Sequence, residues 1–335
     1  MGAFASALVY TLEDVPGKGK GLIAASDIPM GTRIISEKPF VTVPTQVRTM
    51  EQQWIRVYQQ VLALSVHQKR EFLAMDNVYP YTNPTEEYHG IFRTNALPIG
   101  SDLGGGGVFL HACRINHACD PNATNFWNEN LDKLTIHAIR DIQKGEEITI
   151  SYLEATRNKK ARAKDLKQLF KFVCLCQLCS LPRQQSKESD KRLDRVHQLD
   201  NLIEEAGLEG LVWSAQRLLG YVDEQVQLWN EETSKLIGLT RAYPDAVQIA
   251  IANGDLARGL VFAERALALY RGALGDDSPD VAEYKKLVRD PATHEYYGMS
   301  MQWKTAPEEI PMLLEVTEAA KFEDWLWRRG GRTVR

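Results

Sequence analysis

Three cysteines lie close together in the chain, at a spacing that lets their thiolates hold one metal ion. They are Cys174, Cys176 and Cys179. Tetrahedral zinc takes four ligands, so a fourth side chain must come from elsewhere. A redox pair at Cys176 and Cys179 is the alternative, but the βαβ pattern around thioredoxin-type pairs is absent here. We therefore expect a structural zinc site. The candidates for its fourth ligand are Cys113, Cys119, His111 and His117.

A second stretch combines polar side chains with a proline: Asn116-His117-Ala118-Cys119-Asp120-Pro121-Asn122. This composition favours a turn, and an asparagine buried next to a histidine can satisfy backbone groups without any further function. Tyr152, in the same way, can have a structural role or a functional one. It ends the apolar, β-branched segment 148–152, where a tyrosine is usually a core residue with one hydrogen-bonded hydroxyl.

Lys18 and Lys20 alternate with glycines at positions 17, 19 and 21. The segment lacks the Gly-Lys-Ser/Thr order of a P-loop. Two lysines flanked by glycine can hold a carboxylate or phosphate through charge-assisted hydrogen bonds, and a solvated turn explains the same residues equally well. A second glycine run, at 104–107, matches no nucleotide motif and is predicted to be a flexible loop.

The sequence around these side chains predicts short strands and helices. Predicted strands cover 21–25, 33–37, 40–43, 107–110, 133–138 and 148–152. Helical spacing of apolar residues over 46–75 indicates one or two inserted helices, and a basic helix is expected over 157–172, just before the cysteines. From about 191 to 328 the pattern is almost all helical. Within it, 254–270 looks like half of a tetratricopeptide-type helix pair without a clean repeat.

The composition is that of an ordinary globular chain, and it argues against several classes of protein. It has 335 residues, is 44% apolar and 25% charged, and carries a net charge of −4. This gives room for about two domains. It also lacks the basic excess typical of direct nucleic-acid binders. No apolar run approaches the ~18 residues of a membrane-spanning helix. The five cysteines are an odd, clustered set, which suits the reducing environment of the nucleus or cytoplasm.

Taken together, these motifs resemble the signature of SET-domain protein lysine methyltransferases. Asn116–Asn122 is similar to the asparagine-histidine-x-cysteine-x-proline-asparagine motif of that family. Gly145–Tyr152 is similar to its glycine-glutamate-glutamate…tyrosine motif. The cysteines at 174, 176 and 179 look like a post-SET cluster. The helical insert and the helical C-terminal region resemble the SMYD branch of the family.

The resemblance implies an α+β fold in two parts. A β-rich SET domain with a helical insert and a zinc-binding post-SET loop would be followed by an all-α, degenerate TPR-like domain. The implied boundaries are 1–182 for the SET domain (halves at 1–45 and 91–153, insert at 46–90, post-SET region at 154–182) and 191–335 for the helical domain.

The same resemblance implies S-adenosylmethionine as methyl donor and one structural zinc. Tyr152 would sit at the methyl-transfer point, and Phe170 would line the lysine channel where relatives often have tyrosine. Lys18 and Lys20 would hold the methionine carboxylate, and Phe172 would stack on adenine. The full set of expected cofactor-binding residues is Lys18, Lys20, Asn95, Asn116, His117, Tyr152 and Phe172. The expected zinc ligands are Cys119, Cys174, Cys176 and Cys179, with Cys113 free.

The implied activity is methylation of a lysine on a protein substrate, with a further protein partner possible on the helical domain. The sequence departs from the SMYD branch in one respect. Residues 46–90 contain no cysteine and only His67 and His89, so the MYND zinc finger expected between the SET halves is absent. The alternative function is a non-catalytic SET-like interaction protein. Phe170, which replaces the common tyrosine, is the feature that favours it.

Overall fold

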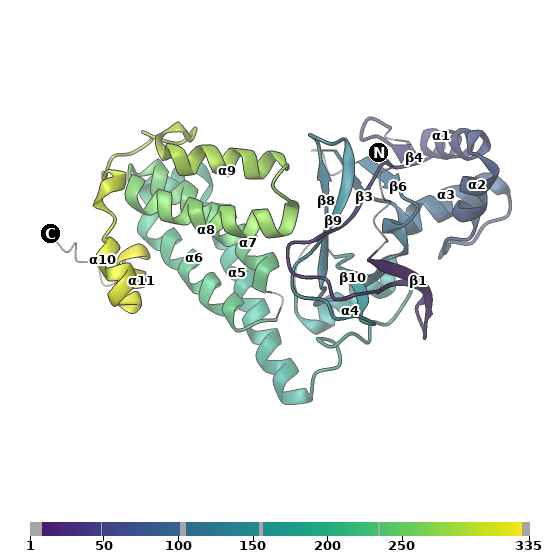
Figure 1. Cartoon of the computed structure of the whole chain (residues 1–335), viewed down its shortest axis with the longest axis horizontal. Helices are drawn as coiled ribbons and strands as arrows, with labels where there is room; N and C mark the ends of the chain where they lie inside the picture. The colour runs from purple at the N-terminus through teal and green to yellow at the C-terminus, as the bar shows by residue number, and fades with distance from the viewer. Residues whose placement is uncertain (1–8, 48, 101–104, 154–156, 234, 330–335) are drawn as a thin grey trace, which may run out of the picture. The chain divides into compact units, whose positions relative to one another are not determined.

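The computed structural model describes residues 9–47, 49–100, 105–153, 157–233 and 235–329. The chain forms two compact units. The first consists of residues 1–155, 160–180 and 272–279, and the second of 156–159, 181–271 and 280–335. Figure 1 shows that strands and the purple and blue helices make up the first unit, whereas the second is built from helices. The predicted α+β class, with a β-rich part followed by a helical part, is confirmed.

Three small sheets form the frame of the first unit. The four-stranded sheet has the order β1 (Tyr10–Val15), β2 (Gly19–Ala24), β10 (Glu147–Ile150), β7 (Asn116–His117). The second sheet has the order β3 (Arg33–Glu37), β9 (Lys133–Ala138), β8 (Ala123–Asn128). The third has the order β4 (Val41–Val43), β6 (Gly105–Val108), β5 (Leu97–Ile99). Strand β8 was not predicted from the sequence, although it pairs with β9 along its whole length.

The pairing of β10 with β7 is parallel, and it brings the two sequence motifs together. Thr149 lies opposite Asn116, and Ile150 lies opposite His117. On its other edge β10 pairs antiparallel with β2, where Ile148 lies opposite Leu22. Ile148 and Leu22 are fully buried in the core of the first unit. Burial of such large aliphatic side chains stabilises the fold by about 1.5–3 kcal/mol each, so the central strand that precedes Tyr152 is held firmly.

The helical insert contains α1 (Met50–Ala63), α2 (Val66–Leu73) and α3 (Pro84–Asn95). The first two confirm the helices predicted within 46–75, and α3 was not predicted. Its N-terminus carries the usual signals, because the Asn83 side chain accepts a hydrogen bond from the Glu86 amide and Pro84 occupies the first turn. Apolar side chains of all three helices pack together against β4 and β6 in a separate core.

Of the glycine run at 104–107, residues 105–107 are not a flexible loop, and position 104 lies outside the described residues. Residues Gly105–Val108 form β6, the central strand of the third sheet, between β4 and β5. The prediction failed because glycine carries no side chain to show an alternating pattern. The structure gives a steric reason for one of these glycines: a Cβ at Gly107 would lie 2.9 Å from both Ile99 Cγ2 and Pro39 Cβ.

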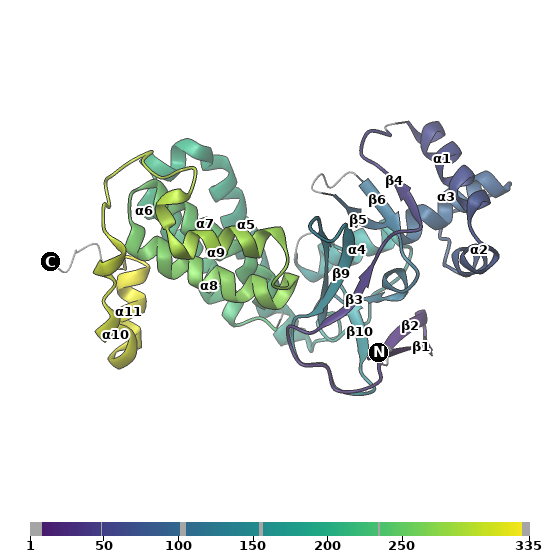
Figure 2. The ribbon, with the colours of Figure 1, turned by 45° about the horizontal axis from the view of Figure 1, so that its top comes forward.

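A short segment from late in the sequence belongs to the first unit. Within residues 272–279, Asp277 forms an ion pair with Arg33 of β3, and the Asn128 side-chain amide donates to the same carboxylate at 3.0 Å. The Asn130 side chain donates to the Asp277 carbonyl at 2.8 Å. Strands β3 and β9 run side by side in both ribbon views (Figure 2), and this segment completes the polar contacts at the ends of β3 and β8.

The second unit is almost entirely helical, as predicted. Its longer helices are α5 (Arg183–Trp213), α6 (Ala215–Asn230), α7 (Lys235–Ala252), α8 (Leu256–Leu274) and α9 (Pro279–Arg289). The shorter α10 (Met312–Thr317) and α11 (Ala319–Leu326) follow. Helix α5 is interrupted at Gly207, whose φ is +54°. Among the described helices, none is long and apolar enough to cross a lipid bilayer.

Candidate functional site

Tyr152 lies two residues beyond β10 and is fixed through its backbone and its side chain. Its hydroxyl donates to the Ile115 carbonyl at 2.7 Å, and its amide N–H donates to Nδ1 of His117 at 3.0 Å. Both partners lie at the start of the Asn116–Asn122 motif. The parallel β7–β10 pairing therefore joins the two sequence motifs into one structure around this tyrosine.

Four aromatic rings gather at this point, from three separate parts of the chain. The ring centroid of Tyr152 is 5.0 Å from that of Phe170 and 5.3 Å from that of His117. Phe172 lies 6.0 Å from His117 and 6.4 Å from Phe170. The two phenylalanines follow helix α4 (Lys159–Leu169) and flank Lys171, whose φ is +61°. This aromatic cluster contains Tyr152, Phe170, His117 and Phe172, all expected site residues.

His117 is buried and the other three rings of the aromatic cluster are half-buried, and this burial sets the charge of the polar groups in the cluster. Burial raises the pKa of Tyr152 well above its usual range, so the side chain remains a phenol at physiological pH. Burial also lowers the pKa of His117 to about 4, so its imidazole is neutral. Neither group is a strong base or a charged acid. Their chemistry is that of neutral hydrogen-bonding groups in an apolar setting.

The four cysteines expected as metal ligands come together beside the aromatic cluster. The sulfurs of Cys119, Cys174, Cys176 and Cys179 all lie within 4.8 Å of one another. The Cys119 sulfur is 3.9 Å from that of Cys174 and 3.5 Å from that of Cys179. Zn–S bonds of ~2.3 Å in a tetrahedron place sulfurs about 3.8 Å apart, whereas a disulfide needs ~2.05 Å. The donor set therefore fits one tetrahedral zinc ion.

Cys113 lies elsewhere. Its thiol donates to the Asn95 carbonyl at 3.1 Å and accepts from the Phe109 amide at 3.2 Å. Burial raises the pKa of this thiol to about 12, so it stays protonated and is a poor metal ligand. Of the candidates for the fourth ligand, the structure brings Cys119 to the cluster and gives Cys113 a separate role against the end of α3.

A buried arginine contacts the sulfur cluster from α4. Arg162 is only 2% exposed, and its Nη2 lies 3.9 Å from the Cys179 sulfur. The sequence analysis did not single it out, because its partner Cys179 lies 17 positions further along the chain, beyond α4. A zinc ion with four thiolates carries a net charge of −2, so a guanidinium at this distance offsets part of that charge.

Lys18, Glu147 and Asn116 form a hydrogen-bonded group at the edge of the four-stranded sheet. The Lys18 ammonium donates to one Glu147 carboxylate oxygen at 2.6 Å, and the Asn116 amide donates to the other at 2.9 Å. The Asn116 amide also donates to the Lys20 carbonyl at 3.1 Å. Gly21 is required here, because a Cβ at this position would lie 2.8 Å from the Asn116 amide nitrogen. Glu147 is a site residue that the sequence analysis missed.

Lys20 and Asn95, the remaining expected cofactor residues, each bind neighbouring residues outside the aromatic cluster. Lys20 pairs with Asp14 across the β1–β2 hairpin at 2.8 Å and is half exposed. The Asn95 amide donates to the carbonyls of Asp76 and Ile91, at 2.8 and 2.7 Å, which fixes the end of α3. Lys20 is therefore paired with Asp14, and Lys18 with Glu147. The Asn95 carbonyl accepts a hydrogen bond from Cys113, which lies outside the sulfur cluster.

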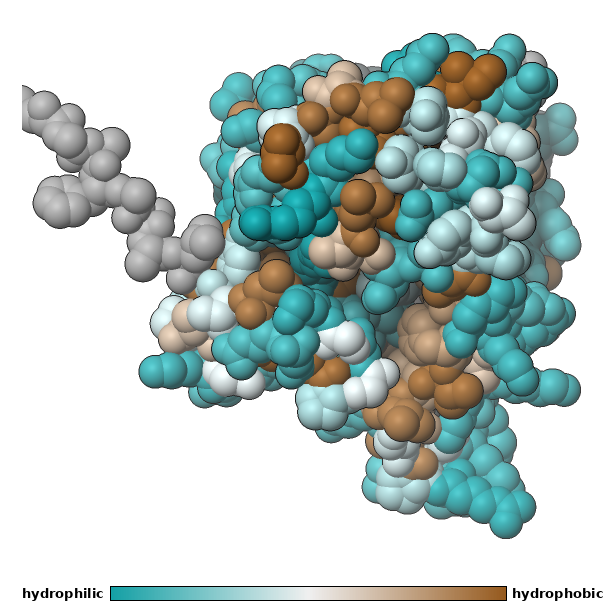
Figure 3. Space-filling model, turned by 90° about the vertical axis from the view of Figure 1, so that its right-hand side faces the viewer, coloured by the Kyte–Doolittle hydropathy of each residue, from teal (hydrophilic) through white to brown (hydrophobic). Residues whose placement is uncertain are grey.

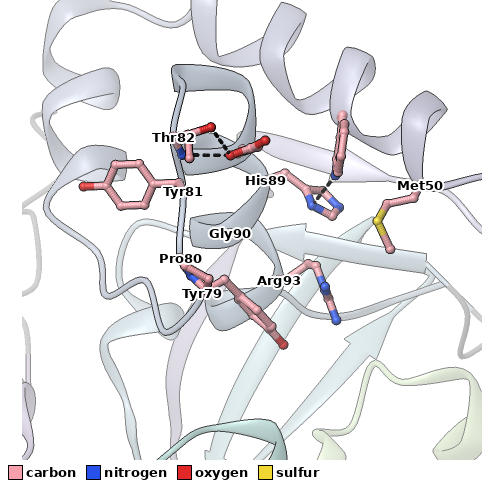
Figure 4. Close-up of a pocket in the computed structure, with 10 residues that line it drawn as sticks. Met50, Tyr79, Pro80, Tyr81, Thr82, His89, Gly90 and Arg93 are labelled. Atoms are coloured by element: carbon pink, nitrogen blue, oxygen red, sulfur yellow. Dashed lines mark hydrogen bonds between the residues drawn. The ribbon is translucent and has the colours of Figure 1, made fainter.

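A separate cavity of about 420 Å³ lies in the helical insert (Figure 4). None of the expected site residues lines it. Arg93 stacks on the Tyr79 ring at 4.3 Å, and Trp54 donates from its indole nitrogen to His89 at 2.8 Å. Figure 3 views the molecule from the side that carries the insert and shows hydrophobic patches between hydrophilic areas. The exposed apolar side chains of the insert are Met50, Ile55, Leu62, Val66, Leu73 and Tyr81.

Comparisons with known proteins agree with this geometry. Residues 19–153 match the model of the SET domain. Over 329 residues the chain is 31% identical to "Histone-lysine N-methyltransferase set5" of Schizosaccharomyces pombe, which covers 95% of this chain and 94% of that protein. Two human proteins match a shorter part. "Protein-lysine N-trimethyltransferase SMYD5" is 41% identical over 78 residues, 22% of this chain and 19% of its own length.

The second human match is "Histone-lysine N-methyltransferase SMYD3". It is 36% identical over 86 residues, 26% of this chain and 19% of its own length. The fission yeast relative thus aligns with both units of this chain, and the two human SMYD proteins with 22% and 26% of it. The matched SET region contains β2 to β10 and both motifs around Tyr152. The chain belongs to the SET-domain family of lysine methyltransferases.

Proposed function

We propose that this protein transfers a methyl group from S-adenosylmethionine to the side-chain nitrogen of a lysine in a protein substrate. The observation that carries the proposal is the aromatic cluster around Tyr152. It forms where the two family motifs meet and is closed by Phe170 and Phe172 from the segment before the cysteines. The names of the relatives, histone-lysine and protein-lysine methyltransferases, support this substrate class.

The bound cofactor supplies a methyl group on a positively charged sulfur. The acceptor must be a neutral amine, yet a free lysine titrates near ~10.4. An apolar, aromatic channel disfavours the ammonium form and lowers the lysine pKa. Phe170 and Tyr152, with ring centroids 5.0 Å apart, provide such surroundings. The lysine nitrogen gains the carbon–nitrogen bond as the carbon–sulfur bond breaks, and the extra proton on nitrogen leaves to solvent.

Tyr152 is suited to orient the reacting groups. Its only hydroxyl proton is directed to the Ile115 carbonyl. The oxygen lone pairs therefore remain available to accept a hydrogen bond from a lysine amine. Because the raised pKa keeps this group a neutral phenol, it acts by placement and not by taking a proton.

For the cofactor we propose the residues expected from the family motif. Lys18, Asn116 and Glu147 already form one polar group, and Lys18 is 33% exposed in its side chain, so it can turn toward a carboxylate. Lys20 is the more exposed of the two lysines and would supply a second positive charge. Phe172 would contact adenine. Asn95 and His117 would contribute mainly through their backbone.

We propose that Cys119, Cys174, Cys176 and Cys179 hold one structural zinc ion. Three of them follow Phe172 directly, and the fourth belongs to the motif that contains His117. Zinc would thus fasten the segment with Phe170 and Phe172 to the motif around Tyr152. A set of four cysteines leaves no open position on the metal, which fits a structural and not a catalytic ion.

The direct test is incubation of the full chain with S-adenosylmethionine labelled in the methyl group, together with purified histones and, separately, a cell extract. We expect label on lysine in at least one protein, identified by mass spectrometry, and at least roughly 100-fold less label with Tyr152→Phe. A chain that binds the cofactor in calorimetry but labels no protein in either mixture would refute the activity and favour the interaction-protein alternative.

A further inference from the structure

The two ring nitrogens of His117 contact two parts of the site at once. Nδ1 lies 3.0 Å from the Tyr152 amide nitrogen, and Nε2 lies 3.2 Å from the Cys119 sulfur. The ring is only 4% exposed. Its backbone is held in β7 opposite Ile150, and the next residue, Ala118, donates to the Ile150 carbonyl at 3.0 Å. The imidazole therefore bridges a proposed metal ligand and the residue at the proposed methyl-transfer point.

The direction of each hydrogen bond of the His117 ring follows from which nitrogen carries a proton. A backbone N–H can only donate, so Nδ1 must accept from Tyr152 and cannot carry a proton. With Nδ1 unprotonated, the ring proton lies on Nε2, which is 3.2 Å from the Cys119 sulfur. A thiolate bound to zinc keeps lone pairs that accept such a bond. A ring with the opposite tautomer would place two hydrogens between Nδ1 and the Tyr152 amide.

We propose that His117 is a positioning residue whose imidazole couples the four-cysteine metal centre to Tyr152. The proposal rests on the zinc site and the role of Tyr152 proposed above. With both ring nitrogens engaged inside the protein, the side chain is not a contact for the cofactor. A metal ion bound at Cys119 would fix the position of that sulfur, which accepts the Nε2–H bond. The ring, and with it the Tyr152 amide, is then held in place.

Two substitutions separate the two ends of this bridge. His117→Asn places an oxygen near the position of Nδ1, so it can still accept from Tyr152, but it cannot reach Cys119. His117→Gln places an amide N–H near the position of Nε2, so it can donate to Cys119, but it offers no acceptor to Tyr152. We expect zinc affinity, measured by competition with a chelator, to fall roughly 10- to 100-fold in His117→Asn and to stay near the parent value in His117→Gln.

Turnover should show the reverse order. At saturating zinc, His117→Gln should lower kcat with little change in KM, because Tyr152 has lost its backbone tether. His117→Asn should keep most of kcat. The control is His137→Asn, at another buried histidine of the first unit, which accepts a hydrogen bond from Arg33. It should leave zinc affinity unchanged. Equal zinc affinity and equal kcat in the Asn and Gln variants would overturn the proposal.

A second measurement uses the unaltered protein and does not depend on how the variants fold. The zinc is replaced by cadmium, and the His117 ring is observed by nitrogen and cadmium NMR. We expect Nδ1 to be unprotonated, Nε2 to carry the proton, and that proton to show a coupling to cadmium through the sulfur. A proton on Nδ1 would overturn the proposal. Absence of lysine methylation would instead refute the proposed function, and this NMR result would still test the bridge.

Discussion

The Tyr152 hydroxyl is tied to Ile115, the residue directly before the Asn116–His117 strand β7. The 2.7 Å bond ends on the backbone carbonyl of Ile115, a residue that is only 1% exposed. A carbonyl in this position cannot move without disturbing the core. The tyrosine oxygen is therefore placed by the backbone of the first motif, and not by a side chain that could rotate.

Tyr152→Phe should lower kcat roughly 100-fold or more, because a polar group that acts on the transition state is lost. Cofactor affinity should change little, since the ring and its packing remain. Steady-state kinetics on the identified substrate and calorimetry with S-adenosylmethionine give the two values. Tyr88→Phe, in the insert, is the matched control and should keep parental kcat. If Tyr152→Phe is as active as the parent, Tyr152 is only a core residue.

Phe170→Tyr should change the number of methyl groups added to each lysine. The Phe170 ring lies 5.0 Å from that of Tyr152, so an added hydroxyl can hydrogen-bond the amine and take up space in the channel. We expect a shift toward fewer methyl groups, read by mass spectrometry of the product at matched turnover. An unchanged distribution of mono-, di- and trimethyl-lysine would remove Phe170 from the channel.

Asn116→Ala should weaken S-adenosylmethionine binding by about 10- to 100-fold. The amide holds the Lys20 carbonyl and the Glu147 carboxylate, and its loss leaves polar groups unpaired at a cost of about 1–3 kcal/mol. Calorimetry on the folded variant measures the effect. Asn125→Ala on β8 serves as control and should bind normally. Unchanged affinity in a well-folded Asn116→Ala variant would show that the motif is only structural.

Cys119→Ser should reduce bound zinc from one per chain to near zero after dialysis against a weak chelator, whereas Cys113→Ser should retain it. The reason is position: the Cys119 sulfur lies within the cluster, and Cys113 contacts Asn95 and Phe109. Elemental analysis of both proteins is sufficient. Loss of zinc in the Cys113 variant alone would reverse this assignment.

Arg162→Met should weaken zinc binding by roughly 10- to 100-fold, in the range seen when groups that support metal ligands are removed. The substitution keeps the long apolar part of a buried side chain and removes the charge near Cys179. Lys164→Met, on the exposed side of the same helix, removes the same charge and should have no effect on zinc. Chelator competition compares the two. Equal affinities would show that Arg162 contributes packing only.

Much of the site could be predicted because many of its residues belong to short sequence motifs. The cysteine spacing and the two motifs identified Tyr152, Phe170 and the four sulfurs, which the structure brings together. Contacts between distant residues could not be predicted in the same way. Lys18 is paired with a carboxylate 129 positions away, and β8 forms only because β9 lies beside it. The orientation of the His117 ring depends on Tyr152 and Cys119 together.

Residues 272–279 affect when the first unit can finish folding during synthesis of the chain. On a ribosome, chain order sets the order of folding, and N-terminal parts usually fold first. Here Arg33 and Asn128 both bind Asp277. The first unit therefore gains these contacts only after the helices through α8 have been synthesised. A protein cut after the last cysteine would lack these partners. We therefore expect the first unit, when expressed without residues 272–279, to be less stable than in the full chain.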